Sequence, residues 1–305
     1  MNKLVNCGLE NRFGTNCLKW DGLKSRFGNE NLIAMWVADM DFKAPQPVID
    51  ALKERVNHGI FGYNIIPDSY YEAFINWEKE KHGYNVKKEW IRFSPGVVPA
   101  LFWFINILTN PGDSCIVMGP VYYPFHDAIK ENERKLIFNN LKNDNGIYTI
   151  DFEKFEEDII ENQVKLFILS SPHNPIGRVW TKEELKRVLD ICKANDVFVL
   201  ADEIHQDIII GDKKQIPAAT IGNYDDILVT LTAATKTFNL ASCQNSFVVI
   251  PNDEIREKFD KYYNSIGGDN GNVFGYIAVE AAYRYGEEWL KEILDKIRGN
   301  YEYTK

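Results

Sequence analysis

Short, continuous hydrophobic runs recur along the chain and alternate with longer amphipathic stretches. The runs contain several β-branched residues and lie at residues 114–118, 165–169, 197–200, 227–230 and 247–250. Runs that are continuous rather than alternating are typical of strands buried on both faces, which occur in parallel sheets. We therefore expect these segments to build a mostly parallel sheet.

The stretches between the runs have the period of helices. The clearest one, residues 181–195, opens with Thr181 and Glu184 at the spacing of a capping box and then places apolar residues on one face. The same period recurs at residues 48–56, 70–77 and 286–303. Alternating strands and helices predict an α/β fold in three layers, α/β/α, with helices on both faces of the sheet. The first 45 residues are rich in Asn, Gly and aromatic residues, and predict irregular structure that wraps around the sheet.

Composition and charge narrow the class of protein. A chain of 305 residues can bury a large core, and a net charge of −9 argues against nucleic acid or an anionic membrane surface as a partner. No hydrophobic run approaches 18 residues, and the N-terminus has no apolar signal sequence. The five cysteines contain no CxxC pair, so neither a disulfide scaffold nor a zinc ribbon is expected. A reducing compartment, the cytoplasm, follows as the expected location.

Polar, glycine or aromatic residues follow each predicted strand. The segments are SPGVVPA, GPVYYPF, SSPHNPIG, DEIHQD and TAATK. Ligands of open parallel sheets bind beyond the carboxyl ends of the strands, so these segments are expected to line one crevice.

Asp202 is the first candidate in that crevice. It follows the run VFVLA directly, so its carboxylate should be buried and in need of a cation or of hydrogen-bond donors. It can instead cap a neighbouring loop. A metal site in DEIHQD is a further alternative, but strand alternation would turn Glu203, His205 and Asp207 away from Asp202. No second cluster of ligands at metal spacing is present, so no metal is predicted.

Asn174 and the segment at Val97 offer further polar groups. Two prolines and a glycine stiffen the loop around Asn174, which would fix the direction of its side-chain amide, although a plain turn Asn fits the same pattern. A helix that begins at Val97 would present free backbone N–H groups to an anion. Most helix N-termini bind nothing, so this feature has little weight alone.

Lys236 is the most unusual residue of the chain. It is the only charged residue between positions 227 and 252, and no acidic residue lies within 9 positions of it. Burial lowers the pKa of a lysine, and a desolvated amine is a nucleophile that can condense with a carbonyl. The alternative is a lysine whose amine reaches solvent past a polar loop.

These candidates together suit one cofactor. Pyridoxal phosphate (PLP) needs an amine for its aldehyde, a carboxylate for its ring nitrogen, an aromatic ring face and N–H or hydroxyl groups for its phosphate. The chain resembles fold type I PLP enzymes of the aminotransferase class I/II group, and more narrowly the MalY/PatB branch of cystathionine β-lyases. The resemblance is carried by WVADMDF, FGYN, SPGVVPAL, GPVYYPF, SPHNPIGRVW, ADEIHQDI and TKTFNLA, which occur in this order over nearly the whole chain.

The resemblance implies a role for each candidate residue. Lys236 would bond the cofactor aldehyde and later move the Cα proton, and Asp202 would pair with the pyridine nitrogen. Tyr122 would stack on the ring, while Asn174 and His205 would lie at its oxygen-bearing edge. The phosphate would be held by Val97 and Val98 N–H groups, by the hydroxyl of Thr235 with that of Thr232 as a further candidate, and by Tyr63 of a second subunit. A homodimer follows from the last of these roles.

The resemblance also implies the reaction and the domain division. We expect α,β-elimination from cysteine thioethers, with transamination as the alternative and a non-catalytic regulatory protein as a second one. Residues 1–45 would belong with a small domain, 46–285 would form the large cofactor-binding domain, and 286–305 would begin the C-terminal part of the small domain. Chains of this family run some 80 to 90 residues further, to an arginine that grips the substrate carboxylate. We therefore expect a C-terminally truncated small domain without that arginine.

Overall fold

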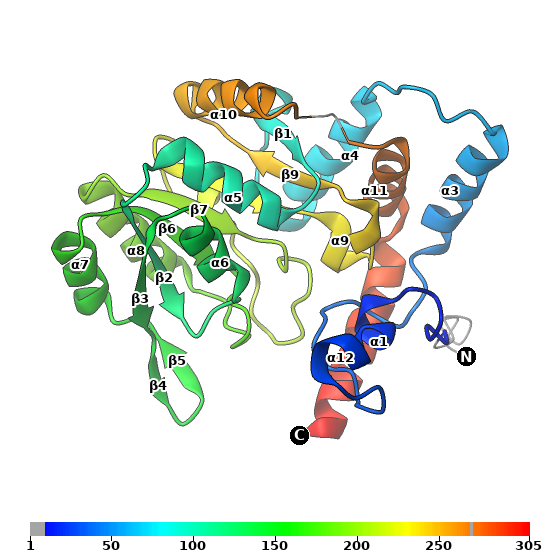
Figure 1. Ribbon diagram of the computed structural model, residues 1–305, viewed down its shortest axis with the longest axis horizontal. Coiled ribbons are helices and arrows are strands. Elements are labelled where there is room, and N and C mark those ends of the chain that lie inside the picture. The colour runs from blue at the N-terminus through cyan, green and yellow to red at the C-terminus, as the bar shows by residue number, and fades with distance from the viewer. Residues whose placement is uncertain (1–9, 269–270) are drawn as a thin grey trace.

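The computed structural model describes residues 10–268 and 271–305, and a seven-stranded sheet lies at its centre (Figure 1). The strand order is β1-β9-β8-β7-β6-β2-β3. The strands are β1 (Ile91–Ser94), β2 (Ser114–Gly119), β3 (Lys135–Asn140), β6 (Val164–Ser170), β7 (Phe198–Asp202), β8 (Leu228–Thr232) and β9 (Ser246–Val249). All five predicted hydrophobic runs lie in or overlap these strands.

The sheet is mostly parallel, as its hydrophobic runs predict. Strands β3, β2, β6, β7 and β8 pair in parallel, whereas β9 is antiparallel to both β8 and β1. The continuous run in β9 therefore reflects burial on both faces and not parallel pairing, since the two cannot be told apart from the sequence. Strand β3 gave no continuous run because it lies at the edge and is half exposed. A separate hairpin joins β4 (Lys142–Asp144) to β5 (Ile147–Thr149).

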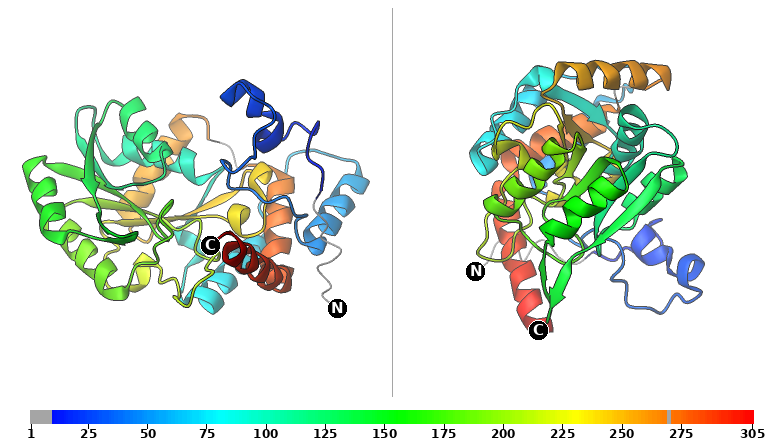
Figure 2. Two further views of the ribbon diagram at one scale, coloured as in Figure 1. Left: turned by 90° about the horizontal axis from the view of Figure 1, so that it is seen from below. Right: turned by 90° about the vertical axis from the view of Figure 1, so that its left-hand side faces the viewer.

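Helices cover both faces of the sheet, which confirms the three-layer prediction (Figure 2). In β6, Leu166 and Ile168 face one helical layer, and the alternating residues Phe167 and Leu169 face the other. The first layer contains α5 (Val97–Leu108), α6 (Pro124–Glu131) and α10 (Asp253–Ser265). The second contains α7 (Phe152–Glu161) and α8 (Lys182–Ala194).

The predicted capping box is present at the start of α8. The Thr181 hydroxyl accepts a hydrogen bond from the backbone N–H of Glu184 at 3.2 Å, and the Glu184 carboxylate accepts one from the backbone N–H of Thr181 at 2.8 Å. These bonds satisfy N–H groups that have no partner inside the helix.

A third hydrophobic cluster lies against the β1 and β9 edge of the sheet. Phe247 and Val249 of β9 pack there against four helices. These helices are α3 (Gln46–His58), α4 (Asp68–Trp77), α11 (Val273–Tyr285) and α12 (Glu287–Thr304), and they include the three further predicted helical segments. The domain division at residues 45 and 285 stays a prediction.

The remaining elements are short. The described part of the first 45 residues is irregular apart from α1 (Leu18–Asp21) and α2 (Leu23–Phe27). A π-helical turn (Glu78–His82) extends α4, and a one-turn helix, α9 (Ala234–Thr237), carries Lys236. Single 3₁₀ turns occur at Lys88–Trp90, Ala218–Thr220 and Ala241–Cys243. Within residues 10–268 and 271–305, no helix is both long and apolar enough to cross a membrane.

Candidate active site

The carboxyl ends of four parallel strands bring the predicted site residues to one edge of the sheet. Asp202, the last residue of β7, is in register with Ser170 of β6 on one side and with Leu231 of β8 on the other. Residues that follow neighbouring parallel strands emerge at the same edge. Tyr122, Asn174, His205 and Lys236 follow β2, β6, β7 and β8 in this way.

Asp202 is a buried carboxylate whose charge is poorly compensated. Its side chain accepts one hydrogen bond in the described structure, from the backbone N–H of Ile204 at 3.1 Å. Burial raises the pKa of Asp202 to about 7, and the Ile204 bond and the charge of Lys236 oppose this rise without cancelling it. The carboxylate therefore keeps unused capacity to accept a proton or a hydrogen bond from a cationic partner.

Lys236 presents a half-buried amine close to two carboxylates. Its Nζ donates a hydrogen bond to the backbone carbonyl of Ala38 at 2.9 Å. Burial lowers the pKa of Lys236, and the charges of Asp39 and Asp202 oppose this effect only in part. Although no acidic residue is near in sequence, the fold supplies these two, and the amine is still easier to deprotonate than an exposed lysine.

His205 lies within electrostatic range of Lys236, at a position that strand geometry does not predict. Strand β7 ends at Asp202, and residues 204–207 form a turn, so the alternation that would separate His205 and Asp207 from Asp202 does not apply. Burial and the nearby charge of Lys236 lower the pKa of His205 to about 4, so the ring is neutral near pH 7. Within the described residues, no group of three or more His, Cys, Asp and Glu side chains is placed to hold a metal ion.

Asn174 and Tyr122 are joined through their backbones. The Tyr122 N–H donates to the Asn174 carbonyl at 3.1 Å, and the Asn174 N–H donates to Ser170 Oγ at 3.1 Å. The side-chain amide of Asn174 makes no hydrogen bond within the described residues. Asn174 and His205 line a cavity of about 870 Å³ that lies between the loops after β6 and β7 and the C-terminal part of α12.

The candidate phosphate donors lie at the start of α5 and at the end of β8 with α9. Helix α5 begins at Val97, so the N–H groups of Val97 and Val98 have no carbonyl of an earlier helical turn to bond. Thr235 is buried in α9, and Thr232 is buried at the end of β8 with a hydroxyl that has no partner in the described structure. Leaving a buried hydroxyl without a hydrogen bond costs free energy. The unpaired hydroxyl of Thr232 is therefore available to a bound ligand.

Tyr63 does not join this group within one chain. Its side chain is fully exposed, on the segment between α3 and α4. Other large apolar side chains of this segment are exposed as well, among them Ile60, Phe61 and Ile65. The role of Tyr63 at the phosphate of a second subunit therefore stays a prediction.

The N-terminal segment supplies residues that the sequence did not single out. Ala38 and Asp39 belong to the WVADMDF motif, and they approach Lys236 from 198 and 197 positions away. Asn239, three residues after Lys236, holds this segment through hydrogen bonds with Met40 and Phe42. The only sequence signal for this contact was the motif itself, since contacts over such separations leave no periodic pattern.

Comparisons with known proteins agree with this arrangement. Cystathionine beta-lyase PatB of Bacillus subtilis (strain 168) is 42% identical to the chain over 292 residues, which are 95% of this chain and 76% of that protein. The structure of cystalysin from Treponema denticola, which contains a pyridoxal 5′-phosphate cofactor, superposes with a TM-score of 0.93 at 36% identity. The PLP-bound C-S lyase from Staphylococcus hominis gives 0.91 at 34% identity. These alignments cover 98% and 97% of this chain, and 76% and 75% of those structures.

A family model adds the broader assignment. The model described as aminotransferase class I and II matches residues 30–304, which is nearly the whole chain. The matched region contains α9 with Lys236, the end of β7 with Asp202, and the loops after β2 and β6. The chain belongs to the aminotransferase class I and II family.

Proposed function

We propose that this protein is a PLP-dependent C–S β-lyase that cleaves cysteine thioethers to a thiol, pyruvate and ammonia. One observation carries the proposal: an amine with a lowered pKa, Lys236, lies within electrostatic range of a buried carboxylate with unused acceptor capacity, Asp202, at the same edge of the sheet. That pairing is what a carbonyl cofactor with a basic ring nitrogen requires.

The residues at this edge fit the cofactor chemically. A protonated ring nitrogen would supply the positive charge that buried Asp202 lacks, and the uncommitted amide of Asn174 could donate to the ring oxygen. The N–H groups of Val97 and Val98 and the hydroxyls of Thr235 and Thr232 would bind the phosphate. Tyr122, half-buried at the end of β2, would cover the ring face.

The chain's own groups would then divide the work. Bound PLP supplies an aldehyde that condenses with amines and a ring that accepts electron density from the substrate Cα. Lys236, released from the cofactor by the substrate amine, would take the Cα proton as general base. The thiolate would leave from Cβ and be protonated to the thiol, and water would convert the remaining three-carbon unit to pyruvate and ammonia. Because His205 is neutral, it does not repel the positive charge that Lys236 acquires when it takes this proton.

The names of two relatives favour elimination over transamination. PatB is named a cystathionine beta-lyase and the Staphylococcus hominis protein a C-S lyase, both at identities above 30%. We further propose a homodimer in which the exposed Tyr63 reaches the phosphate of the other subunit.

The cofactor site is tested by covalent capture. The purified protein is incubated with pyridoxal phosphate and reduced with borohydride, and the adduct is located by peptide mass spectrometry. In wild type, we expect the cofactor to modify one residue, Lys236. In Lys236→Ala, we expect no adduct on the peptide that contains position 236. Lys165→Ala serves as a control for non-specific capture by an exposed lysine. Modification spread over surface lysines, unchanged in Lys236→Ala, would refute the site.

The reaction type is tested with cystathionine. A lyase releases pyruvate without an added 2-oxo acid, whereas an aminotransferase needs one, such as 2-oxoglutarate, and forms glutamate from it. We expect pyruvate and ammonia in equal amounts. Glutamate formation without pyruvate would establish the aminotransferase alternative.

A further inference from the structure

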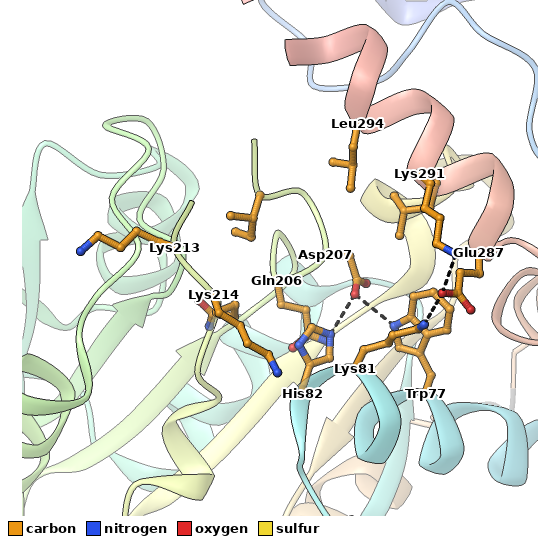
Figure 3. Close-up of a pocket in the computed structure, with 13 residues that line it drawn as sticks. Trp77, Lys81, His82, Gln206, Asp207, Lys213, Lys214, Glu287, Lys291 and Leu294 are labelled. Atoms are coloured by element: carbon orange, nitrogen blue, oxygen red, sulfur yellow. Dashed lines mark hydrogen bonds and ion pairs between the residues drawn. The ribbon is translucent and has the colours of Figure 1, made fainter. Parts of the chain in front are cut away.

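A buried carboxylate, that of Asp207, is hydrogen-bonded to the residue that follows the lysine of the candidate site. It accepts three hydrogen bonds, from His82 Nε2 at 2.8 Å, Trp77 Nε1 at 3.1 Å and Thr237 Oγ1 at 2.7 Å. The side chains of His82 and Asp207 are only 6% and 4% exposed. Figure 3 shows Asp207 between His82 and Trp77 on the wall of a pocket of about 280 Å³.

Thr237 links this carboxylate to Lys236. The two residues are neighbours in α9, a helix of a single turn whose N-cap, Ala233, provides no side-chain hydrogen bond. An isolated turn is unstable by itself, because nucleation fixes several dihedral angles for one hydrogen bond. The bond from buried Thr237 to Asp207 is therefore one of the contacts that hold the turn, and with it the Cα–Cβ direction of Lys236.

The surroundings of Asp207 keep it in place. Burial disfavours the protonated form of His82, but the hydrogen bond to Asp207 and the charges of Asp207, Glu78 and Glu203 outweigh this effect and raise the pKa of His82. The ring N–H of His82 and the indole N–H of Trp77 hold one carboxylate oxygen of Asp207, and the hydroxyl of Thr237 holds the other. Lys81, which also lines the pocket, is paired with Glu287 and does not compete for Asp207.

We propose that Asp207, held by His82 and Trp77, is a positioning residue that fixes through Thr237 the direction in which Lys236 meets the cofactor. None of these four side chains needs to touch the cofactor for this effect. The inference rests on the proposed function of Lys236. It adds to the site a group of residues that position the lysine and take no part in the reaction themselves.

The first test exchanges the hydroxyl of Thr237. Thr237→Val keeps the shape and loses the donor, whereas Thr237→Ser keeps the donor. The readout is the rate at which pyridoxal phosphate is captured at Lys236 by borohydride reduction. We expect Thr237→Val to slow capture about tenfold, the usual order for losing a hydrogen bond to a charged group, and Thr237→Ser to stay within about twofold of wild type. Equal rates for the two variants would overturn the proposal, whether both are fast or both are slow.

The second test uses His82 in the same assay. His82→Gln retains an N–H donor toward Asp207, whereas His82→Leu removes it. We expect capture in His82→Leu to slow by a factor similar to that in Thr237→Val. The double variant should be no slower than either single one, because both act through Asp207. Independent, multiplying losses would refute a shared route through Asp207.

A third readout does not depend on the cofactor. Hydrogen–deuterium exchange of the 233–240 segment in the unloaded protein should be faster in Thr237→Val than in Thr237→Ser and wild type. If wild type captures no cofactor at Lys236, the proposed function fails, while this exchange still tests the anchor. If wild type captures cofactor and exchange in Thr237→Val is unchanged, the positioning role alone fails.

Discussion

Burial acts in opposite directions on the two residues at the centre of the candidate site. It favours the uncharged form of each, so the pKa of Lys236 falls and the pKa of Asp202 rises to about 7. The charge of each residue partly offsets the effect of burial on the pKa of the other. A cationic ring nitrogen bound at Asp202 would remove the larger part of that carboxylate's cost, so cofactor binding and the charge state of the site are coupled.

Glu203 provides a residue-scale prediction of pH dependence. Burial raises the pKa of Glu203 to about 8, from an ordinary value of 4.5. Because the folded pKa is the higher one, the folded state is favoured by a proton that it retains, and this stability is lost as the pH rises from about 4.5 through 8. Glu203→Gln mimics the protonated acid at every pH. We therefore expect its free energy of unfolding to fall by roughly 1–3 kcal/mol less than that of wild type between pH 5 and pH 8.

Urea denaturation at the two pH values measures this difference. Glu183→Gln on the exposed face of α8 removes a charge of the same sign and should leave the pH dependence of wild type unchanged. A Glu203→Gln variant with the same loss of stability between pH 5 and pH 8 as wild type would contradict the prediction.

At the scale of elements, the site is built from the ends of regular structure. Helix α8 shows how such ends are held, since its capping box was recognisable in the sequence and is present in the fold. Helix α9 lacks any such local signal, although it carries Lys236. The difference is physical: a long amphipathic helix has a sequence pattern, whereas a single turn depends on contacts that distant residues provide.

The cap of α8 gives an element-scale prediction. Thr181→Ala removes the side-chain acceptor for the Glu184 N–H and should lower the free energy of unfolding by about 1 kcal/mol. Thr181→Ser retains the acceptor and should recover most of this loss. Chemical denaturation midpoints of the three proteins decide the matter, and an Ala variant as stable as the Ser variant would count against the cap.

At the scale of the whole molecule, hydrogen bonds of Asn239 fasten the N-terminal segment to the turn after α9. Its side chain donates to the carbonyls of Met40 at 3.0 Å and Phe42 at 2.9 Å, and accepts from the Met40 N–H at 3.0 Å. These bonds join residues 197 to 199 positions apart and place Ala38 against Lys236. The candidate site therefore depends on both the N-terminal segment and the turn that contains Asn239.

Removing the Asn239 side chain should loosen that segment. Asn239 has a left-handed backbone, with φ of 59°, so Asn239→Gly removes the three bonds without adding backbone strain. We expect limited proteolysis between residues 10 and 42 to become several-fold faster, as local opening costs less. Asn145→Gly, in the exposed turn between β4 and β5 with φ of 52°, is the matched control. Cleavage at the wild-type rate in Asn239→Gly would show that other contacts hold the segment.

The sequence by itself determined the three layers, the parallel core of the sheet, the helices α3, α4, α5, α8 and α12, and the edge of the sheet at which the candidate residues meet, because burial and helical period repeat at short range. The singularity of Lys236 and the position of Asp202 at a strand end were visible for the same reason. Only the tertiary structure decided that β9 runs antiparallel, that the charge of Lys236 acts on His205, and that Ala38, Asp39 and Asp207 surround the lysine segment. These features depend on where one strand ends and on contacts between residues far apart in the chain, and neither leaves a periodic trace in the order of the residues.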